Sequence, residues 1–352
     1  MKKFFLGKAY KKNSNRIRNL SENQKKIVLQ INSMDSSLDY EEASCICNSA
    51  DPLQFSEIDR YGISAFNNLC KNCGTIWLSP RWNQERYNKF YENSYRNLYS
   101  YFISDKEEYI RQLFNDSSSK KGTSFWLNKK LKDIHLNNSM PKALEIGAGA
   151  GWTIAGLSGT WKKIAYDVDE DFINIGKKLF DINFKKGFLR DSATDINDSD
   201  LIILSHVFEH FLNPKVDLKF IFDNMKNNSY LFIEVPGIFN IHKSALNPMT
   251  YMQNVHVFTY SREVISELLK SLGFTILFSD ERVRIIAKKE QNNQSKKFNF
   301  SNKKLVNKTY RYLKFCEIGI KIFFLIRKIP FTGRVLGFIW RKFYFNFGVF
   351  FK

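Results

Sequence analysis

The chain has 352 residues, of which 43% are hydrophobic, so it is long enough to bury a sizeable core and is expected to form two domains. Its formal net charge is +19, and much of the excess lies in residues 1–26 and 295–352. No uncharged apolar run of about 18 residues occurs, which argues against a helix that spans a membrane. The charge is weak evidence for a nucleic-acid partner, because many Lys, Asn, Ile and Phe residues are also typical of an AT-rich genome.

Residues 1–37 are basic and polar, with little hydrophobic periodicity. This composition predicts a basic N-terminal arm that is poorly ordered or forms a loose helix. A solvated tail is favoured over an arm that binds nucleic acid, so nucleic acid is not the expected partner of this segment.

Two pairs of cysteines follow, Cys45 with Cys47 and Cys70 with Cys73. Close pairs separated by about twenty residues are typical of a structural zinc site with four thiolate ligands, and the segment between the pairs would form a hairpin. The second pair has the usual C-x-x-C-G spacing of a zinc knuckle, whereas the first pair, C-x-C, is one residue short. A small zinc-ribbon-like domain is therefore predicted over residues 38–101, and a degenerate ribbon without metal is the alternative.

Aromatic side chains recur at helical spacing over residues 82–101. They predict a helix whose aromatic face packs against another domain, with carbohydrate stacking on the rings as the alternative. Residues 102–140 are interpreted as a linker, because of the Ser-rich stretch 115–124, followed by a helix that leads into the next domain.

The stretch Lys142–Leu157 is predicted to form a strand, a glycine turn and a helix. Such a turn lets the backbone approach a ligand closely, and the following helix offers unpaired N–H groups. The glycines are spaced G-x-G-x-G, and Trp152 stands where the nicotinamide fingerprint needs a small residue, which disfavours a dinucleotide. The acid Glu145 lies two residues before the first glycine.

Short buried strands alternate with helices over residues 141–289, which predicts an α/β fold with a Rossmann-like, doubly wound and mostly parallel sheet. Asp167 ends the second strand, where this fold places an acid on ribose hydroxyls. Ser205 and His206 end the fourth strand. Ligands of such sheets bind beyond the carboxyl ends of the strands, so these residues are expected at the site.

Four segments in order resemble the class I S-adenosylmethionine (SAM) methyltransferases. E-x-G-x-G-x-G resembles their motif I, DLIILSHVFEHF the fourth strand of the "HVLEH" type, YLFIEVPG the fifth strand, and NVHVFTYSREVISELLKSLGFTILFSDE the segment after it. CGTIWLSPRWNQERYNKFYENSYRNLY resembles the stretch after the zinc ribbon in such enzymes from bacterial sugar and polysaccharide gene clusters. The resemblance implies SAM as the cofactor, bound by Glu145, Gly147, Ala148, Gly149, Gly151, Asp167, Ser205 and His206.

The resemblance also implies an acceptor. Related sugar C-methyltransferases carry a Y-x-E-H pattern after the fifth strand, and the matching residues here are Gln253-Asn254-Val255-His256, which retain only the histidine. This favours O-methylation of a sugar or polysaccharide hydroxyl, with His256 as the general base. His210 is the alternative base, and Glu209 would orient a histidine.

Other functions remain open at this point. Carbon or nitrogen methylation of a sugar would use the same cofactor. A tethering subunit of a surface-polysaccharide assembly complex would keep the fold without turning over SAM. RNA methylation is disfavoured, because Ser205-His206-Val207-Phe208 replaces the N/D-P-P-Y/F motif that enzymes acting on base nitrogens often carry after the fourth strand.

Residues 290–352 form a basic extension in which aromatic residues are interleaved with Lys and Arg. This pattern suits a helix that lies in a membrane interface or one that packs on the N-terminal domain, and both readings stay open. Cys316 is expected to pack as a small apolar residue. No signal peptide is visible, so the expected location is the cytoplasm, with a peripheral membrane contact through residues 303–352 as a further expectation.

Overall fold

The computed structural model describes the chain except for residues 1–5, 7–9, 12–18, 100–104, 135–138, 245–247, 292–295, 330–335, 341–343 and 345–352. The chain forms two compact units. The first consists of residues 1–101, 236–264 and 299–352, and the second of residues 102–235 and 265–298. The units are therefore not the consecutive segments expected from the sequence, because two distant stretches of chain join the N-terminal residues.

The second unit is built on a seven-stranded sheet with the order β12-β13-β10-β9-β6-β7-β8. Five neighbouring strands are parallel, and β13 runs in the opposite direction between β10 and β12, so the predicted mostly parallel α/β sheet is confirmed. The strands are β6 (Lys142–Ile146), β7 (Lys162–Asp167), β8 (Asn183–Lys186), β9 (Leu201–Ser205), β10 (Tyr230–Glu234), β12 (Phe274–Ser279) and β13 (Arg284–Lys289). All residues of β10 are buried, as expected for the centre of a sheet that is covered on both faces.

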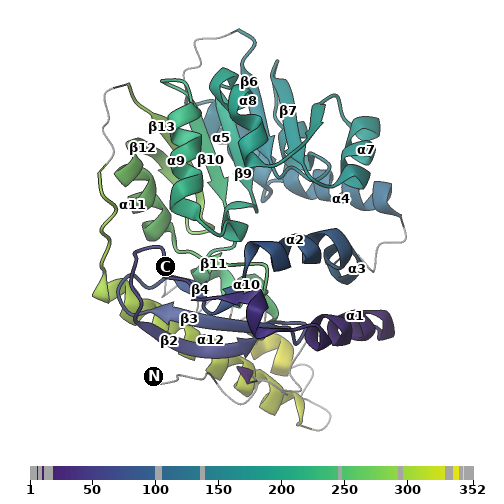
Figure 1. The fold of residues 1–352 in the computed structure, drawn as a ribbon, viewed down its shortest axis with the longest axis vertical. Helices are drawn as coiled ribbons and strands as arrows, with labels where there is room; N and C mark the ends of the chain where they lie inside the picture. Colours follow the sequence, from purple (N-terminus) through teal and green to yellow (C-terminus); the bar gives the residue numbers. More distant parts are fainter. Residues whose placement is uncertain are drawn as a thin grey trace. The chain divides into compact units, whose positions relative to one another are not determined.

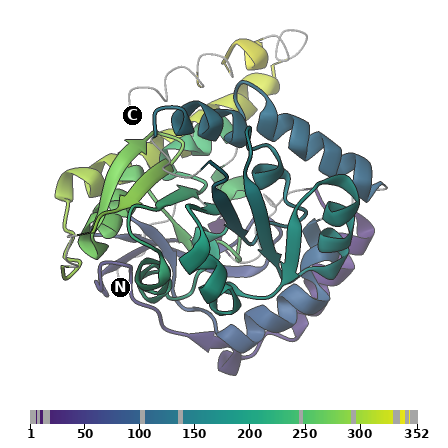
Figure 2. The same ribbon diagram turned by 90° about the horizontal axis from the view of Figure 1, so that it is seen from above.

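Helices cover both faces of this sheet (Figures 1 and 2). They are α4 (Lys106–Ser118), α5 (Thr123–Leu131), α6 (Trp152–Ala155), α7 (Glu170–Leu179), α8 (Ala193–Asp198), α9 (Pro214–Asn224) and α11 (Arg262–Leu272), with 3-10 turns η3 (Leu189–Ser192) and η4 (Phe208–His210). The prediction of a linker over residues 115–124 is wrong. Helix α4 continues to Ser118 and α5 begins at Thr123, and the hydroxyls of Ser117 and Ser124 bond to each other at 2.6 Å, so these serines are packed rather than solvated.

The first unit contains a four-stranded antiparallel sheet with the order β11-β4-β3-β2 and a two-stranded sheet of β1 and β5. The strands are β1 (Tyr40–Glu41), β2 (Pro52–Ile58), β3 (Ser64–Cys70), β4 (Ile76–Leu78), β5 (Arg81–Trp82) and β11 (Phe258–Thr259). Phe258 pairs with Trp77 across β11 and β4. The segment that follows β10 in sequence therefore completes the sheet of the first unit.

The predicted basic arm contains an ordered helix, α1 (Glu22–Ser33). Ser21 and Gln24 form a capping box at its start, and Val28 and Ile31 are buried. The side-chain amide of Gln24 donates to the carbonyl of Leu98 at 2.8 Å. Residues 22–33 are thus a packed helix rather than a poorly ordered arm, while most of residues 1–18 lie outside the described part of the chain.

The aromatic stretch forms two short helices, α2 (Gln84–Asn93) and α3 (Tyr95–Tyr99), and packs inside the first unit. The Trp82 ring lies 5.5 Å from the ring of Tyr87 and 5.3 Å from that of Phe90, centroid to centroid. All three rings are buried. They form part of a core, so these rings are not available for stacking on a carbohydrate.

The C-terminal extension forms α12 (Lys303–Arg327), which also belongs to the first unit together with α10 (Ile241–Ser244), η2 (Ser37–Asp39), η5 (Ile238–Asn240) and η6 (Pro248–Tyr251). Its buried residues recur mostly three to four positions apart, as on one face of a helix; they are Leu305, Thr309, Tyr312, Leu313, Cys316, Glu317, Gly319 and Ile320. Cys316 is buried, as predicted. No helix in the described part of the chain is long and apolar enough to cross a membrane.

Candidate cofactor site and thiolate cluster

The glycine turn after β6 has a backbone that only glycine adopts readily. Gly147, Gly149 and Gly151 have φ angles of +66°, +57° and +77°. A Cβ atom on Gly147 would lie 2.4 Å from a methyl of Val207, and one on Gly149 would lie 2.9 Å from the indole of Trp152. The turn is therefore a close-packed cradle in which the main chain itself forms the surface.

Glu145 lies at the base of this turn and is 2% exposed. Its carboxylate accepts a hydrogen bond from the backbone N–H of Ile154 at 3.0 Å, so it caps the single turn of helix α6. Burial raises the pKa of Glu145 to about 8, against the hydrogen bond from Ile154, which lowers it. Helix α6 ends at Ala155, sooner than the apolar sequence suggested.

Asp167 joins the end of β7 to the glycine turn. One carboxylate oxygen accepts from the N–H of Gly149 at 2.6 Å, and the other accepts from the N–H of Asp169 at 2.8 Å. The N–H of Ala148 donates to the carbonyl of Tyr166, which lies on the same strand, at 3.0 Å. The sequence predicted Asp167 at the carboxyl end of β7. The structure shows in addition that its carboxylate stabilises the glycine turn through the hydrogen bond from Gly149.

Ser205 and His206 lie at the carboxyl end of β9, as the sequence predicted. The backbone N–H of His206 donates to the carbonyl of Glu234 at 2.8 Å, and His206 has a φ of +57°, which is uncommon for a residue with a side chain. Partial desolvation lowers the pKa of His206, but the neighbouring carboxylates of Glu209 and Glu234 outweigh it and raise the pKa to about 9. The next residue, Val207, packs against Gly147.

Glu234 is a site residue that the sequence reasoning missed. It ends β10, pairs in register with Ser205, and its side chain is 7% exposed. The signal was present in the sequence, because Glu234 is the only charged residue in the apolar strand Tyr230–Val235 and stands at its carboxyl end.

Glu209 lies between two histidines of the second unit. Its Oε1 is 3.7 Å from Nδ1 of His206 and 3.8 Å from Nε2 of His210. Glu209 is 2% exposed, whereas the His206 side chain is 57% exposed. The buried carboxylate favours the protonated form of His206, and its position between two imidazoles restrains their orientation.

His256 belongs to the first unit. It is partly buried, and its backbone N–H donates to the carbonyl of Gln253 at 3.2 Å. The structure thus groups the predicted cofactor residues with Glu209 and His210 in the second unit, whereas the predicted base lies on a loop of the first.

The four cysteines predicted to bind zinc converge in the first unit. All four sulfur atoms lie within 4.8 Å of one another, with 3.5 Å between Cys45 and Cys73 and 3.6 Å between Cys47 and Cys70. These distances are too long for disulfides and close to the edge of about 3.8 Å that a tetrahedron with Zn–S bonds of ~2.3 Å requires. The segment between the two pairs forms the β2–β3 hairpin, as predicted.

Hydrogen bonds to sulfur surround this cluster. The backbone N–H groups of Asn72 and Cys73 donate to the sulfur of Cys70 at 3.4 and 3.5 Å. The side-chain amide of Asn72 donates to the sulfur of Cys47 at 3.4 Å. Donors aimed at sulfur stabilise thiolates, so the donor set fits a zinc ion even though the first pair is one residue short.

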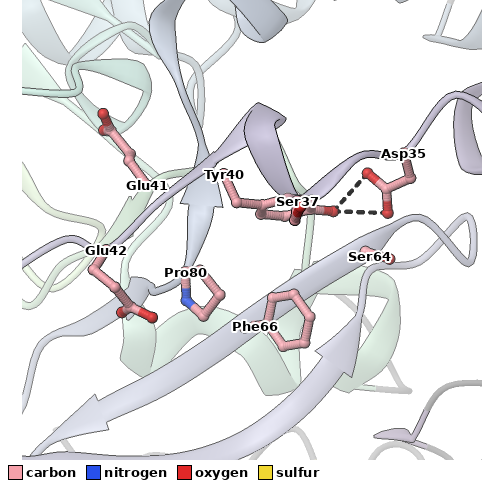
Figure 3. A pocket seen from close by; sticks show the side chains of 8 residues that line it. All are labelled: Asp35, Ser37, Tyr40, Glu41, Glu42, Ser64, Phe66 and Pro80. Atoms are coloured by element: carbon pink, nitrogen blue, oxygen red, sulfur yellow. Dashed lines mark hydrogen bonds between the residues drawn. The ribbon is translucent and has the colours of Figure 1, made fainter.

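A pocket of about 370 Å³ opens elsewhere in the first unit (Figure 3). Its carboxylates already have partners. Asp35 accepts from the hydroxyl of Tyr40 at 2.8 Å, Glu41 pairs with Arg81 at 2.8 Å, and Glu42 accepts from the hydroxyl of Ser79 at 2.8 Å. These bonds hold the β1–β5 region together, so the acidic character of the pocket is explained without a ligand.

Comparison with known proteins agrees with the geometry of the second unit. Residues 107–278 match the family model described as "Methyltransferase domain". No curated protein matches the chain significantly.

Solved methyltransferase structures resemble the chain at low identity. The CurJ carbon methyltransferase is 15% identical with a TM-score of 0.38, and the match covers 48% of this chain and 54% of that one, so this chain spans about half of that protein. The plantazolicin methyltransferase BpumL, solved with SAH, is 15% identical with a TM-score of 0.42, covering 58% and 94%. A SAM-dependent methyltransferase from Thermotoga maritima is 16% identical with a TM-score of 0.38, covering 52% and 95%. These scores are low, so the superpositions carry no argument about activity or substrate.

The residues of the second unit fit SAM. The glycine cradle offers main-chain surface, and the carboxylates of Glu145 and Asp167 suit the ammonium and ribose groups of the cofactor. Together with the parallel sheet, the family match over residues 107–278 supports a class I SAM-dependent methyltransferase domain in this part of the chain.

Proposed function

We propose that the protein transfers a methyl group from SAM to a hydroxyl oxygen of a sugar or polysaccharide. The main support for this proposal is the sequence of residues 253–256, Gln-Asn-Val-His, which retains only the histidine of the Y-x-E-H pattern of the sugar C-methyltransferases. Carbon methylation at a keto-sugar would need the tyrosine and the glutamate as well as the histidine. A hydroxyl acceptor needs alignment and one base.

The side chains beside His256 are committed to packing. The backbone N–H of Asn254 donates to the buried carboxylate of Asp59 at 3.2 Å, and its side-chain amide donates to the carbonyl of Ser64 at 2.7 Å. Val255 is 1% exposed. Among residues 253–256, His256 is thus the group that can accept a proton at neutral pH.

The β2–β3 hairpin anchors this loop. Its tip bonds to residues 252–254 through the N–H of Arg60, which donates to the carbonyl of Met252 at 2.9 Å, and through Asp59. The hydroxyl of Tyr87 donates to the carbonyl of Asn254 at 3.0 Å. The cysteine-bearing unit therefore holds the loop that carries the proposed base, which gives that unit a role in catalysis beyond its own stability.

The chemistry assigns few tasks to the protein. SAM supplies a methyl group on a sulfonium, which is already electrophilic. In our proposal the glycine turn, Glu145 and Asp167 hold the cofactor, and His256 takes the proton of the acceptor hydroxyl. His210, which is restrained by Glu209, is the alternative base.

We propose further that Cys45, Cys47, Cys70 and Cys73 hold one structural zinc ion. The support is the convergence of four sulfurs and the N–H groups that point at them. A four-sulfur site leaves no open position for a substrate, so the ion would stabilise the hairpin rather than take part in methyl transfer.

The direct test uses the purified protein with SAM that carries a carbon-13-labelled methyl group. Candidate acceptors are nucleotide sugars, free oligosaccharides, short peptides and small amines. We expect SAH to form only with a sugar acceptor, and the labelled carbon to show the carbon-13 shift of a methoxy group. A labelled C-methyl or N-methyl group on a sugar would show that carbon or nitrogen, and not oxygen, is the methylated atom. Turnover confined to peptides or amines would refute the sugar acceptor.

A further inference from the structure

Exposed apolar side chains gather at the C-terminal end of the chain. Of the sixteen large apolar residues that are exposed in the described part of the chain, seven lie between residues 318 and 339; they are Ile318, Phe324, Leu325, Ile329, Leu336, Phe338 and Ile339. Single exposed apolar residues are ordinary, but a cluster of this size marks a surface that meets another apolar phase.

The structure shows why these side chains are turned outward. Residues 336–340 are helical, and the indole N–H of Trp340 donates to the carbonyl of Gly319 at 3.0 Å. The ring of Tyr344 lies where a Cβ on Gly319 would be, 2.0 Å from it, and stacks on Phe315 at 5.0 Å between centroids. The chain thus folds back along α12, and Gly319 permits the close approach.

The outward face of α12 has a regular pattern. Ile318 and Leu325 lie seven residues apart, so they share one side of the helix, away from the buried stripe that includes Ile320, and the exposed Ile329 follows two residues after the helix ends. Lys321 and Lys328 follow Ile318 and Leu325 by three residues each, and so border the same ridge. Lysines placed beside an apolar ridge can extend their ammonium groups past it.

The charge of this region is mostly positive, and the nearest acid, the buried Glu317, pairs with Lys321 at 3.2 Å. From Ile318 to Lys352 the sequence contains seven Lys and Arg residues, eleven aromatic residues and no Asp or Glu. A second copy of the chain would bring the same positive charge to this face, so self-association is opposed by repulsion. A lipid bilayer with an apolar interior and negatively charged headgroups is complementary to this apolar and basic face.

We propose that the exposed face of α12 and the segment packed on it dock on the surface of an anionic lipid bilayer. The apolar side chains would enter the boundary between headgroups and acyl chains, and the exposed basic side chains beside them, such as Arg327 and Lys328, would lie against lipid phosphates. The contact is peripheral, since one face of α12 stays buried in the first unit. This inference does not depend on the acceptor of the methyl group.

Vesicle co-sedimentation of the 352-residue chain tests the proposal. We expect binding to vesicles of equal parts phosphatidylglycerol and phosphatidylcholine, weaker binding as salt rises, and little binding to phosphatidylcholine alone. The variant Leu325→Ser/Ile329→Ser should bind at least about tenfold more weakly, because two apolar side chains no longer enter the bilayer. The matched control is Leu29→Ser/Leu38→Ser, which removes two residues of the same unit that are 68% and 86% exposed and should leave binding unchanged.

Several outcomes would overturn the proposal. One is a lack of binding to anionic vesicles by protein whose thermal unfolding is normal. Another is an equal loss of binding in both double variants. A dimer in solution that dissociates in Leu325→Ser/Ile329→Ser, without vesicle binding by the original chain, would assign the face to self-association instead.

Discussion

The cofactor edge of the second unit and the thiolate cluster of the first are both proposed as ligand sites, but they are built differently. At the cofactor edge the main chain forms the surface, and each glycine has a positive φ and a neighbour within 3 Å of where its Cβ would be. At the cluster, side chains from two turns converge, and Cys45 and Cys73 are 28 positions apart in the sequence. The geometry of a main-chain site is determined by the local backbone conformation. The geometry of a side-chain site depends on the surrounding fold and on the metal ion that would bind the side chains together.

This contrast predicts that the two sites fail in different ways. Loss of a thiolate should unfold the region around it, because the binding energy of a structural zinc is folding energy. Loss of a cofactor contact should weaken binding while the sheet stays intact, because that sheet has its own apolar core. Four experiments probe the contrast, from the largest expected effect to the smallest.

Removing the proposed metal should have the largest effect. The variant Cys70→Ser/Cys73→Ser should lose near-stoichiometric zinc and, with it, stability of the first unit on the order of 10 kcal/mol. Metal analysis and thermal unfolding measure this, and Cys316→Ser is the control, because Cys316 is buried away from the cluster. Protein purified without chelator that contains almost no zinc would show that the cluster is a degenerate ribbon.

Replacing the proposed base should have the next largest effect. We expect His256→Ala to lower kcat by ~10²–10⁴, because loss of a general base typically costs that much, with little change in SAM affinity. His210→Ala serves as the comparison. If His210→Ala is the damaging change and His256→Ala is nearly silent, the roles are exchanged; if both are silent, the acceptor needs no protein base and a sugar hydroxyl becomes a poor candidate.

Asp167→Ala should weaken SAM binding by roughly 1.5–3 kcal/mol, the usual contribution of a hydrogen bond to a charged group. The variant also removes the acceptor for the N–H of Gly149, so calorimetry should be paired with thermal unfolding. Asp200→Ala is a matched control, because Asp200 accepts from the backbone N–H of Lys142 at the amino ends of the strands, at the opposite edge of the sheet. Equal losses in both variants would assign the effect to stability alone.

The smallest effect concerns the proton on Glu145. Its pKa of about 8 keeps it largely protonated at pH 7 in the free enzyme, and a contact with the SAM ammonium would require the carboxylate. The bound pKa would then lie below the free pKa, so binding should release a proton and strengthen as pH rises towards about 7.5, where the ammonium is still charged. Calorimetry in buffers of different ionisation enthalpy measures this release.

In Glu145→Gln the proton release should disappear, whereas in Glu234→Gln, which removes another buried carboxylate at the same sheet edge, it should persist. Binding by the original protein without proton release would mean that Glu145 only caps α6. The cofactor ammonium would then have to be held by other groups.

Local patterns in the sequence determined much of the second unit. The glycine turn, Asp167, Ser205 and His206 stand where the sequence predicted them, because strand ends and glycine turns are set by residues close in the chain. The cysteine spacing likewise predicted the hairpin and the convergence of four sulfurs. The bracing of the turn by Asp167 and the proximity of Glu234 to His206 could not be predicted, since both depend on the packing of neighbouring strands.

Only the tertiary structure decided the composition of the first unit. Residues 236–264 and α12 join it through contacts such as Phe258 with Trp77 and the bond from Asn254 to Asp59, which connect positions far apart in the chain. The Ser-rich stretch 115–124 became mostly helix, and part of the basic arm became α1, because tertiary contacts satisfied their polar groups. Composition and periodicity report local preference, and a preference of a few tenths of a kcal/mol per residue is readily outweighed by burial and long-range hydrogen bonds.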